Sequence, residues 1–201
     1  MKSETCASPG RPRAFCVEQA LDRALQVFWQ KGYEGASLTD LTDAMGINRP
    51  SLYAAYGNKE ALFRKALDRY VANAGEFFRQ CLDQQTARTA VENLLNLSVE
   101  GVTCADNPHG CLMVRCALSS SETADSVRLE LIRRRADVES ILRKRLERAK
   151  TEGDLPTDVN IADLARYVMT IHQGMSVQAA GGATREQLRR VVKNAMKAWP
   201  D

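Results

Sequence analysis

Five polar or aromatic side chains within eight residues have the chemistry to contact DNA: Arg49, Pro50, Ser51, Tyr53 and Tyr56. An arginine can hold guanine O6 and N7 with two hydrogen bonds, and a serine can donate or accept one. Proline and tyrosine can pack against a thymine methyl group or the sugar-phosphate backbone. On one short helix these residues would crowd at the N-terminus, which itself favours a phosphate. The segment predicts a DNA-contacting face. The alternative is a plain helical hairpin with solvated residues.

The flanking residues carry the signals for two short helices, a tight turn and a third helix. Ser37 and Asp40 form a pair like a capping box, which starts the first helix. Gly46 supplies the left-handed residue that ends it, and Asn48 caps the second helix. Asn58 caps the third helix. Two short helices around a glycine-containing turn predict a helix-turn-helix, the unit that places a helix in the DNA major groove.

The rest of the chain shows helical periodicity and no alternating strand pattern, so the predicted fold class is all-α. We expect an N-terminal three-helix domain that contains the helix-turn-helix, followed by a larger helical domain. The predicted parts are 1–12, a disordered N-terminal arm, 13–58, the helix-turn-helix domain, and 59–201, the larger domain. The further predicted helices span about 17–32, 59–82, 87–104, 111–118, 122–151, 160–180 and 185–199.

Composition excludes several classes of protein. The 201 residues are 44% hydrophobic with a net charge of +3, typical of a globular chain and permissive of a nucleic-acid partner. No apolar run approaches the roughly 18 residues of a membrane span, and no secretory signal opens the chain. The six cysteines have no CxxC spacing, which favours free thiols in a reducing cytoplasm. No GxSxG, glycine-rich phosphate loop or HExxH motif occurs, so we expect no enzyme, cofactor or metal.

Residues 10–65 resemble the DNA-binding domain of the TetR family of transcriptional regulators. The resemblance rests on Phe-Trp-Gln-Lys-Gly-Tyr at 28–33, Gly-Ala-Ser-Leu-Thr-Asp-Leu at 35–41, Ser-Leu-Tyr at 51–53 and Tyr-Gly-Asn-Lys-Glu-Ala-Leu-Phe at 56–63. It implies that Ser37 contacts a phosphate, that 48–53 lie in the recognition helix, and that Tyr56 and Lys59 hold the DNA backbone. The expected DNA-binding residues are Arg11, Arg13, Ser37, Thr39, Asn48, Arg49, Pro50, Ser51, Tyr53, Tyr56 and Lys59.

Three arginine clusters lie outside the helix-turn-helix. Arg11 and Arg13, held extended by Pro12, suit a narrow A·T-rich minor groove, with an ordinary charged tail as the alternative. The runs at 133–135 and 143–145 have acidic residues at helical spacing. We interpret both runs as the solvated face of a long helix.

The last two helices carry broad apolar bands, which the resemblance assigns to an interface with a second copy of the chain. A two-fold dimer would place two recognition helices ~34–36 Å apart and bind a palindrome. The alternative is that these helices cover the core of their own subunit. The expected interface residues are Leu164, Val168, Ile171, Met175, Leu188, Val192 and Met196.

The resemblance also implies a pocket for a small-molecule effector among the middle helices. Cys111 would begin a short helix, a position at which thiols become reactive. Three interpretations of this segment stay open: a thiol switch for oxidants or electrophiles through Cys111 and Cys116, a soft metal such as copper held by Cys, Met and His, or plain packing. The expected pocket residues are Tyr70, Phe77, Cys111, Met113, Cys116, Met169 and His172.

Together these features predict a homodimeric repressor that binds a palindromic DNA operator and is released by a small effector. No membrane partner is expected. A helical protein–protein adaptor would explain the apolar last helices but leaves the face around Arg49 without a purpose. The operator sequence, the regulated genes, the identity of the effector and the sign of regulation do not follow from the residues.

Overall fold

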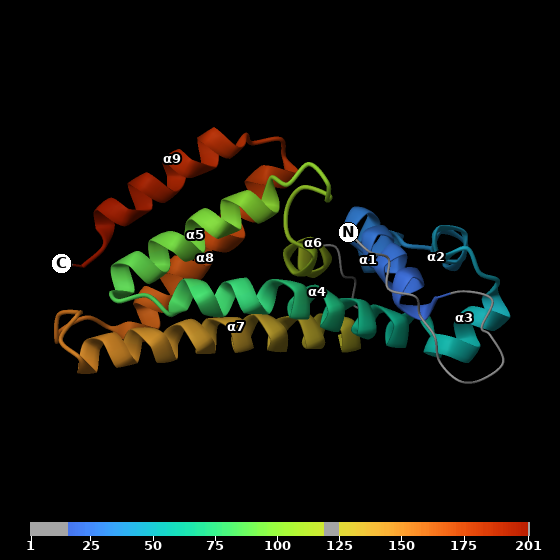
Figure 1. The fold of residues 1–201 in the computed structure, drawn as a ribbon, viewed down its shortest axis with the longest axis horizontal. Helices are drawn as coiled ribbons and strands as arrows, with labels where there is room; N and C mark the ends of the chain where they lie inside the picture. Colours follow the sequence, from blue (N-terminus) through green and yellow to red (C-terminus); the bar gives the residue numbers. More distant parts are fainter. Residues whose placement is uncertain (1–15, 119–124, 201) are drawn as a thin grey trace. The chain divides into compact units, whose positions relative to one another are not determined.

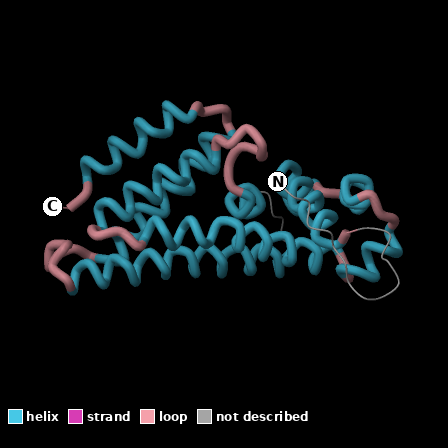
Figure 2. The backbone as a smooth tube through the Cα atoms, viewed as in Figure 1, coloured by secondary structure: helices cyan, strands magenta, loops and turns pink. Residues whose placement is uncertain are grey.

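The structure, a computed structural model, describes residues 16–118 and 125–200 (Figure 1). Within these residues the chain is helical and contains no strand (Figure 2), which confirms the all-α prediction. The helices are α1 (Val17–Gly35), α2 (Leu38–Met45), α3 (Arg49–Tyr56), α4 (Lys59–Leu82), α5 (Ala87–Val102), α6 (Leu112–Leu118), α7 (Asp125–Thr151), α8 (Ile161–Ala180) and α9 (Arg185–Ala195), with a 3-10 turn at Met196–Ala198.

The chain divides into two compact units, Met1–Tyr70 and Val71–Asp201. The division falls inside α4, later in the chain than the predicted start of the second domain at 59. The first turns of α4 belong to the first unit because Leu62, Phe63 and Leu67 are fully buried there. The domain limits 1–12, 13–58 and 59–201 otherwise stay predictions.

Aromatic packing holds the first unit together. The Phe28 ring, fully buried on α1, meets the Phe63 ring edge-on with centroids 5.0 Å apart. The Trp29 ring meets Tyr70 in the same way, also at 5.0 Å. Edge-to-face pairs at such distances add to the free energy of burial and fix the angle between helices. Gly32 interrupts α1 with a φ of 73°, a conformation that favours glycine, so the regular helix ends where the sequence predicts.

The core of the second unit is built from α5, α7, α8 and α9, together with the end of α4. Its fully buried leucines and valines include Leu142 and Leu146 of α7 and Val99 of α5. Among the described residues, none of the helices is long and apolar enough to cross a membrane.

Two residues of the arginine runs depart from the prediction of a solvated face. Arg134 pairs with the buried Glu130 at 2.7 Å, and its own side chain is only 14% exposed. Arg145 is buried, with 6% of its surface exposed. Its Nε donates to the Leu82 carbonyl at 2.9 Å and its Nη2 to the Gln84 carbonyl at 2.8 Å. The guanidinium is drawn inward because the last carbonyls of α4 lack helical partners and carry partial negative charge. Its neighbours follow the prediction: Arg143 pairs with Glu147 at 2.9 Å on the exposed face.

Candidate nucleic-acid interface

A reciprocal capping box starts α2. The Ser37 hydroxyl accepts from the Asp40 backbone N–H at 3.0 Å, and the Asp40 carboxylate accepts from the Ser37 backbone N–H at 3.0 Å. The Lys31 ammonium lies 2.6 Å from the same carboxylate and, with the hydrogen bonds from Ser37, lowers the pKa of Asp40 to about 2. The cap is therefore ionised at neutral pH. Gly46 ends α2 in the left-handed conformation with a φ of 67°. Both sequence predictions are confirmed.

The turn and the start of α3 also follow the prediction. The Asn48 side-chain oxygen accepts from the Ser51 backbone N–H at 2.9 Å. Pro50 occupies the first turn of α3, where no N–H is needed. Leu52 is fully buried and anchors the helix to the first unit. These contacts fix which side of α3 faces outward.

The outward side of α3 carries three exposed side chains that are predicted to contact DNA. Arg49 and Pro50 are exposed, and Tyr53 keeps 49% of its surface exposed. Arg49 also donates from Nη2 to the Thr39 hydroxyl on α2 at 3.1 Å, which brings two of the predicted residues together. A guanidinium has five N–H donors, so this bond leaves others for a base or a phosphate.

Tyr56 corrects the prediction. Its side chain is only 4% exposed, and its hydroxyl donates to the Val17 carbonyl on α1 at 2.6 Å. The expected outward placement of Tyr56 is wrong because Tyr56 lies one helical turn after the buried Leu52 and shares its face. The hydroxyl adds a hydrogen bond to the carbonyl of the first residue of α1.

Ser37 and Lys59 are both engaged within the protein. Besides capping α2, the Ser37 hydroxyl donates to the Asp40 carboxylate at 2.8 Å. The Lys59 ammonium lies 4.6 Å from the centre of the Tyr33 ring, a cation–π geometry, and burial lowers the pKa of Lys59. Their predicted phosphate contacts stay predictions. The predicted minor-groove contacts of Arg11 and Arg13 also stay predictions, because these residues lie outside the described residues.

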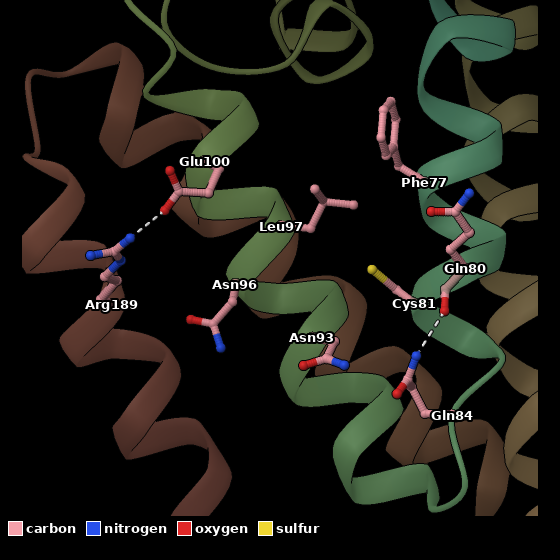
Figure 3. Close-up of a pocket in the computed structure, with 9 residues that line it drawn as sticks. All are labelled: Phe77, Gln80, Cys81, Gln84, Asn93, Asn96, Leu97, Glu100 and Arg189. Carbon is pink, nitrogen blue, oxygen red and sulfur yellow. Dashed lines mark hydrogen bonds and ion pairs between the residues drawn. The ribbon is translucent and has the colours of Figure 1, made fainter.

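The predicted effector residues do not share one cavity. Tyr70 belongs to the first unit, against Trp29. Phe77 lines a cavity of about 570 Å³ (Figure 3). Cys111 lines a separate cavity of about 150 Å³. The remaining four are distributed through the second unit: Met169 (3% exposed) and Cys116 (fully buried) lie in its interior, whereas Met113 and His172 are half-buried.

His172 makes a hydrogen bond with a serine hydroxyl. Its Nδ1 lies 2.7 Å from the hydroxyl of Ser98, and that hydroxyl lies 2.8 Å from the Leu94 carbonyl. The hydroxyl has one hydrogen, so Nδ1 carries the proton of the neutral ring when that hydrogen goes to Leu94, and accepts when it goes to the ring. Burial lowers the pKa of His172 to about 4, so the ring is neutral at physiological pH.

Gly110 determines the position of Cys111. Its φ of 92° is a glycine conformation, and a Cβ there would meet the Ser176 carbonyl at 2.9 Å. The Cys111 backbone N–H then donates to the Ser176 hydroxyl at 2.7 Å. The pattern around Cys111 thus has a packing role, and the thiol switch stays a prediction. In the parts of the chain that the structure describes, no three His, Cys, Asp or Glu side chains gather to hold a metal.

The structure also corrects the predicted dimer interface. All but Ile171 are buried within their own unit, with exposures from 1% for Val168 and Leu188 to 9% for Leu164. Ile171 is half-buried against the same core. The sequence identifies these faces as apolar, but periodicity does not say which molecule covers them. The interface residues that the subunit itself buries are Leu164, Val168, Met175, Leu188, Val192 and Met196, whereas the interface role of Ile171 stays a prediction.

The capped pair α2–α3, with a recognition helix that presents exposed polar side chains, defines a helix-turn-helix DNA-binding protein. Residues 20–66 match the family model of bacterial regulatory proteins of the tetR family, and 89–196 match the tetracyclin repressor-like C-terminal domain. The HTH-type transcriptional repressor ComR of Escherichia coli (strain K12) is 34% identical over 196 residues, 96% of this chain and 93% of ComR. The repressor BdcR of the same strain is 29% identical over 183 residues, 90% of this chain and 87% of BdcR.

A solved structure extends the comparison to DNA. A cysteine mutant of the TetR family transcriptional regulator CifR, complexed with 26bp double-strand operator DNA, is 44% identical. The match covers 94% of this chain and 100% of that chain with a TM-score of 0.91. The chain belongs to the TetR family and is a DNA-binding transcriptional regulator.

Proposed function

We propose that this protein is a repressor that binds a palindromic DNA operator as a homodimer and leaves it when a small molecule binds the second unit. The outward face of α3 carries the proposal. Arg49 and Tyr53 lie at its solvent side while Leu52 holds the helix from behind. ComR and BdcR, named as repressors, support the sign of regulation. Such a protein would act on DNA in the bacterial cytoplasm.

In this assignment α3 enters the major groove and the N-terminus of α2 meets a phosphate. Arg49 would contact a guanine, and Tyr53 would pack on a thymine methyl group or the sugar-phosphate backbone. The first backbone N–H groups of α2, rather than the occupied Ser37 hydroxyl, would meet the phosphate. Lys59 would contribute after leaving the Tyr33 ring.

The apolar faces of α8 and α9 are buried within the subunit, so a dimer needs another surface. The exposed side of α8 is a candidate. Tyr167, Thr170, Gly174 and Val177 recur at spacings of three and four residues and are all exposed and uncharged. A Cβ at Gly174 would meet nothing within 4 Å, so packing within the subunit does not require a glycine there. A mid-helix glycine costs about 1 kcal/mol relative to alanine. Close approach of a second helix would explain its presence.

An equivalent stripe follows on α9. Its members are also exposed and uncharged, and the Tyr167 hydroxyl donates to the Ala195 carbonyl at 3.3 Å, which joins the two helices. The α9 stripe consists of Gln187, Val191 and Asn194, and Ala198 of the following 3-10 turn continues it. Two copies of this uncharged surface related by a two-fold axis would form a self-complementary interface.

The test is sedimentation of the purified chain together with binding to the DNA upstream of its own gene. We expect a dimer whose complex with that DNA persists in an excess of unrelated DNA. Its affinity for the site should fall steeply as the salt concentration rises. Val177→Asp places a charge in the stripe and should give folded monomers with weakened operator binding. Ala162→Asp, at an exposed position of α8 off the stripe, is the control. A wild type that sediments only as a monomer while binding the operator tightly would overturn the dimer.

A further inference from the structure

Arg49 is held at the protein surface by an uncharged hydrogen-bond acceptor. Its Nη2 donates to the Thr39 hydroxyl at 3.1 Å, and both residues are exposed. Arg69 in the same unit pairs with a carboxylate instead, that of Asp22 at 3.0 Å. A carboxylate would offset the charge of an arginine and compete with DNA for it. A hydroxyl orients the guanidinium and leaves its positive charge in place.

The bond to Thr39 leaves one complete fork of the Arg49 guanidinium for another partner. Nη2 carries two hydrogens, one beside the hydrogen of Nε and the other beside a hydrogen of Nη1. Arg69 shows the first of these forks, because its Nε and Nη2 donate to the two oxygens of Asp22 at 3.0 and 3.1 Å. Whichever Nη2 hydrogen of Arg49 goes to Thr39, the other still forms a fork that matches O6 and N7 of a guanine.

The backbone positions of both partners are fixed by local contacts. Thr39 is the second residue of α2, directly inside its capping box, and a β-branched side chain has few χ1 rotamers in a helix. Arg49 is the first residue of α3, directly after the cap of that helix. Asp40, next to Thr39 in the chain, binds Lys31 at 2.6 Å, so its carboxylate already has a cationic partner. The hydroxyl of Thr39 therefore sets the direction of the Arg49 side chain.

We propose that Thr39 is a positioning residue for Arg49, whose guanidinium it orients before DNA binds, and that this contact raises the preference for a guanine. The inference rests on the proposed function, in which Arg49 contacts a guanine. A free arginine side chain loses entropy when a base fixes it, and a hydrogen bond made beforehand reduces that loss. The hydroxyl accepts from Arg49 and keeps its own hydrogen, so Thr39 can donate to a phosphate at the same time.

The first measurement uses the full chain without DNA. The NMR signal of the Arg49 Nε–H group, identified by its loss in Arg49→Ala, has a heteronuclear Overhauser effect that reports fast motion of the guanidinium. Thr39→Val keeps the shape of the side chain and removes the acceptor, so this effect should fall toward that of a freely moving arginine. Thr39→Ser keeps the acceptor and should retain most of the wild-type value. Equal values in the wild type and Thr39→Val would overturn the positioning role.

The second measurement is competition among single-base variants of the operator. Discrimination is the ratio of the Kd values without and with the guanine whose preference is lost in Arg49→Ala. Thr39→Val should lower this ratio about 3- to 10-fold, the range of one net hydrogen bond, and Thr39→Ser should restore it. Thr157→Val changes an exposed threonine of the second unit and should match the wild type.

The double variant Thr39→Val/Arg49→Ala separates positioning from a phosphate contact. If Thr39 acts through Arg49, the loss of its hydroxyl changes the discrimination no further once Arg49 is removed. A loss of affinity in Thr39→Val that is equal for all operator variants, and that persists without Arg49, would assign Thr39 to phosphate alone and reject the inference.

Failure of the proposed function gives a different result. A wild type that does not prefer its operator has no guanine contact, which rejects both the proposed function and the specificity role of Thr39. The NMR difference between the wild type and Thr39→Val would still show the hydrogen bond in that case. Normal operator preference with no NMR difference keeps the proposed function and rejects the positioning role.

Discussion

α3 and α9 are both short amphipathic helices, and the sequence treats their outward faces differently. On α3 the residues expected outside are polar and follow a cap, and Arg49 and Pro50 are exposed. On α9 the residues expected outside are apolar, and Leu188 and Val192 are 1% and 2% exposed against the subunit's own core. Both helices begin at a cap, which fixes the start of each helix by local hydrogen bonds but not the face that is covered. An apolar stripe indicates that its face is covered, but not whether the subunit's own core or a second chain covers it.

The largest expected effect tests the α9 side of this comparison. Leu188→Ala should lower the free energy of unfolding by about 2–5 kcal/mol, because it removes a buried side chain and leaves a cavity. The loss should be the same at high and low protein concentration in chemical denaturation. Val191→Ala is the control on the exposed stripe, where Val191 is 42% exposed. Any loss of stability in Val191→Ala should become smaller as the protein is diluted, because it would come from the dimer interface. If instead the loss of stability in Leu188→Ala becomes smaller on dilution, Leu188 belongs to the dimer interface as first predicted.

The second effect belongs to the same helical unit and depends on pH. The pKa of His172 is lowered to about 4 in the folded chain, against about 6.5 unfolded. Above pH 6.5 both states are neutral and no stability is lost. As pH falls from 6.5 toward 4 the unfolded chain binds a proton first, so stability falls, by on the order of 2 kcal/mol.

The control for this pH effect is His172→Gln, measured by urea denaturation at pH 7 and pH 5. The difference between the two pH values should shrink in the variant, because the other histidine, His109, is exposed. An equal difference in the wild type and the variant would assign the effect to other groups.

Whether the position of a side chain can be predicted from the sequence depends on whether its contacts are local in the chain. The caps at Ser37 and Asn48 are formed as predicted, because each joins atoms three residues apart. Tyr56 and Arg145 escape prediction because their partners, Val17 and the end of α4, are distant in the chain. Chemical type alone suggests an exposed tyrosine or arginine, and only the folded arrangement brings a distant backbone carbonyl within hydrogen-bond reach of each one.

The candidate effector site shows the same limit. Phe77 is the one predicted pocket residue that lines the larger cavity, and it was identified because it is aromatic. The amides of α4 and α5 that surround it carry no periodic signal, since glutamine and asparagine are common on any solvated helix face. Their shared cavity arises from the packing of α4, α5 and α9. The sequence predicts that these helices exist and in what order, but not how they pack in space.

The third prediction tests the α3 side. Arg49→Ala should weaken operator binding by about 1–3 kcal/mol and relax the preference at one base pair, measured by competition among single-base operator variants. Arg23, exposed on α1 and outside the predicted interface, provides the control Arg23→Ala. An equal loss on every operator variant would mean that Arg49 contacts only phosphate and does not distinguish bases.

The smallest effect separates the two roles considered for Tyr56. Tyr56→Phe keeps the buried ring and deletes the hydroxyl that donates to Val17 at 2.6 Å. The Val17 carbonyl then loses a partner, which should lower the free energy of unfolding by about 1 kcal/mol. Operator affinity of the folded protein should not change, because the hydroxyl is turned toward α1. If filter binding instead shows weaker DNA binding at unchanged stability, the hydroxyl leaves Val17 for the DNA backbone. The outward role would then be restored for the complex. This variant therefore decides whether the inward side of α3 serves only the fold, in contrast to the outward side that carries Arg49.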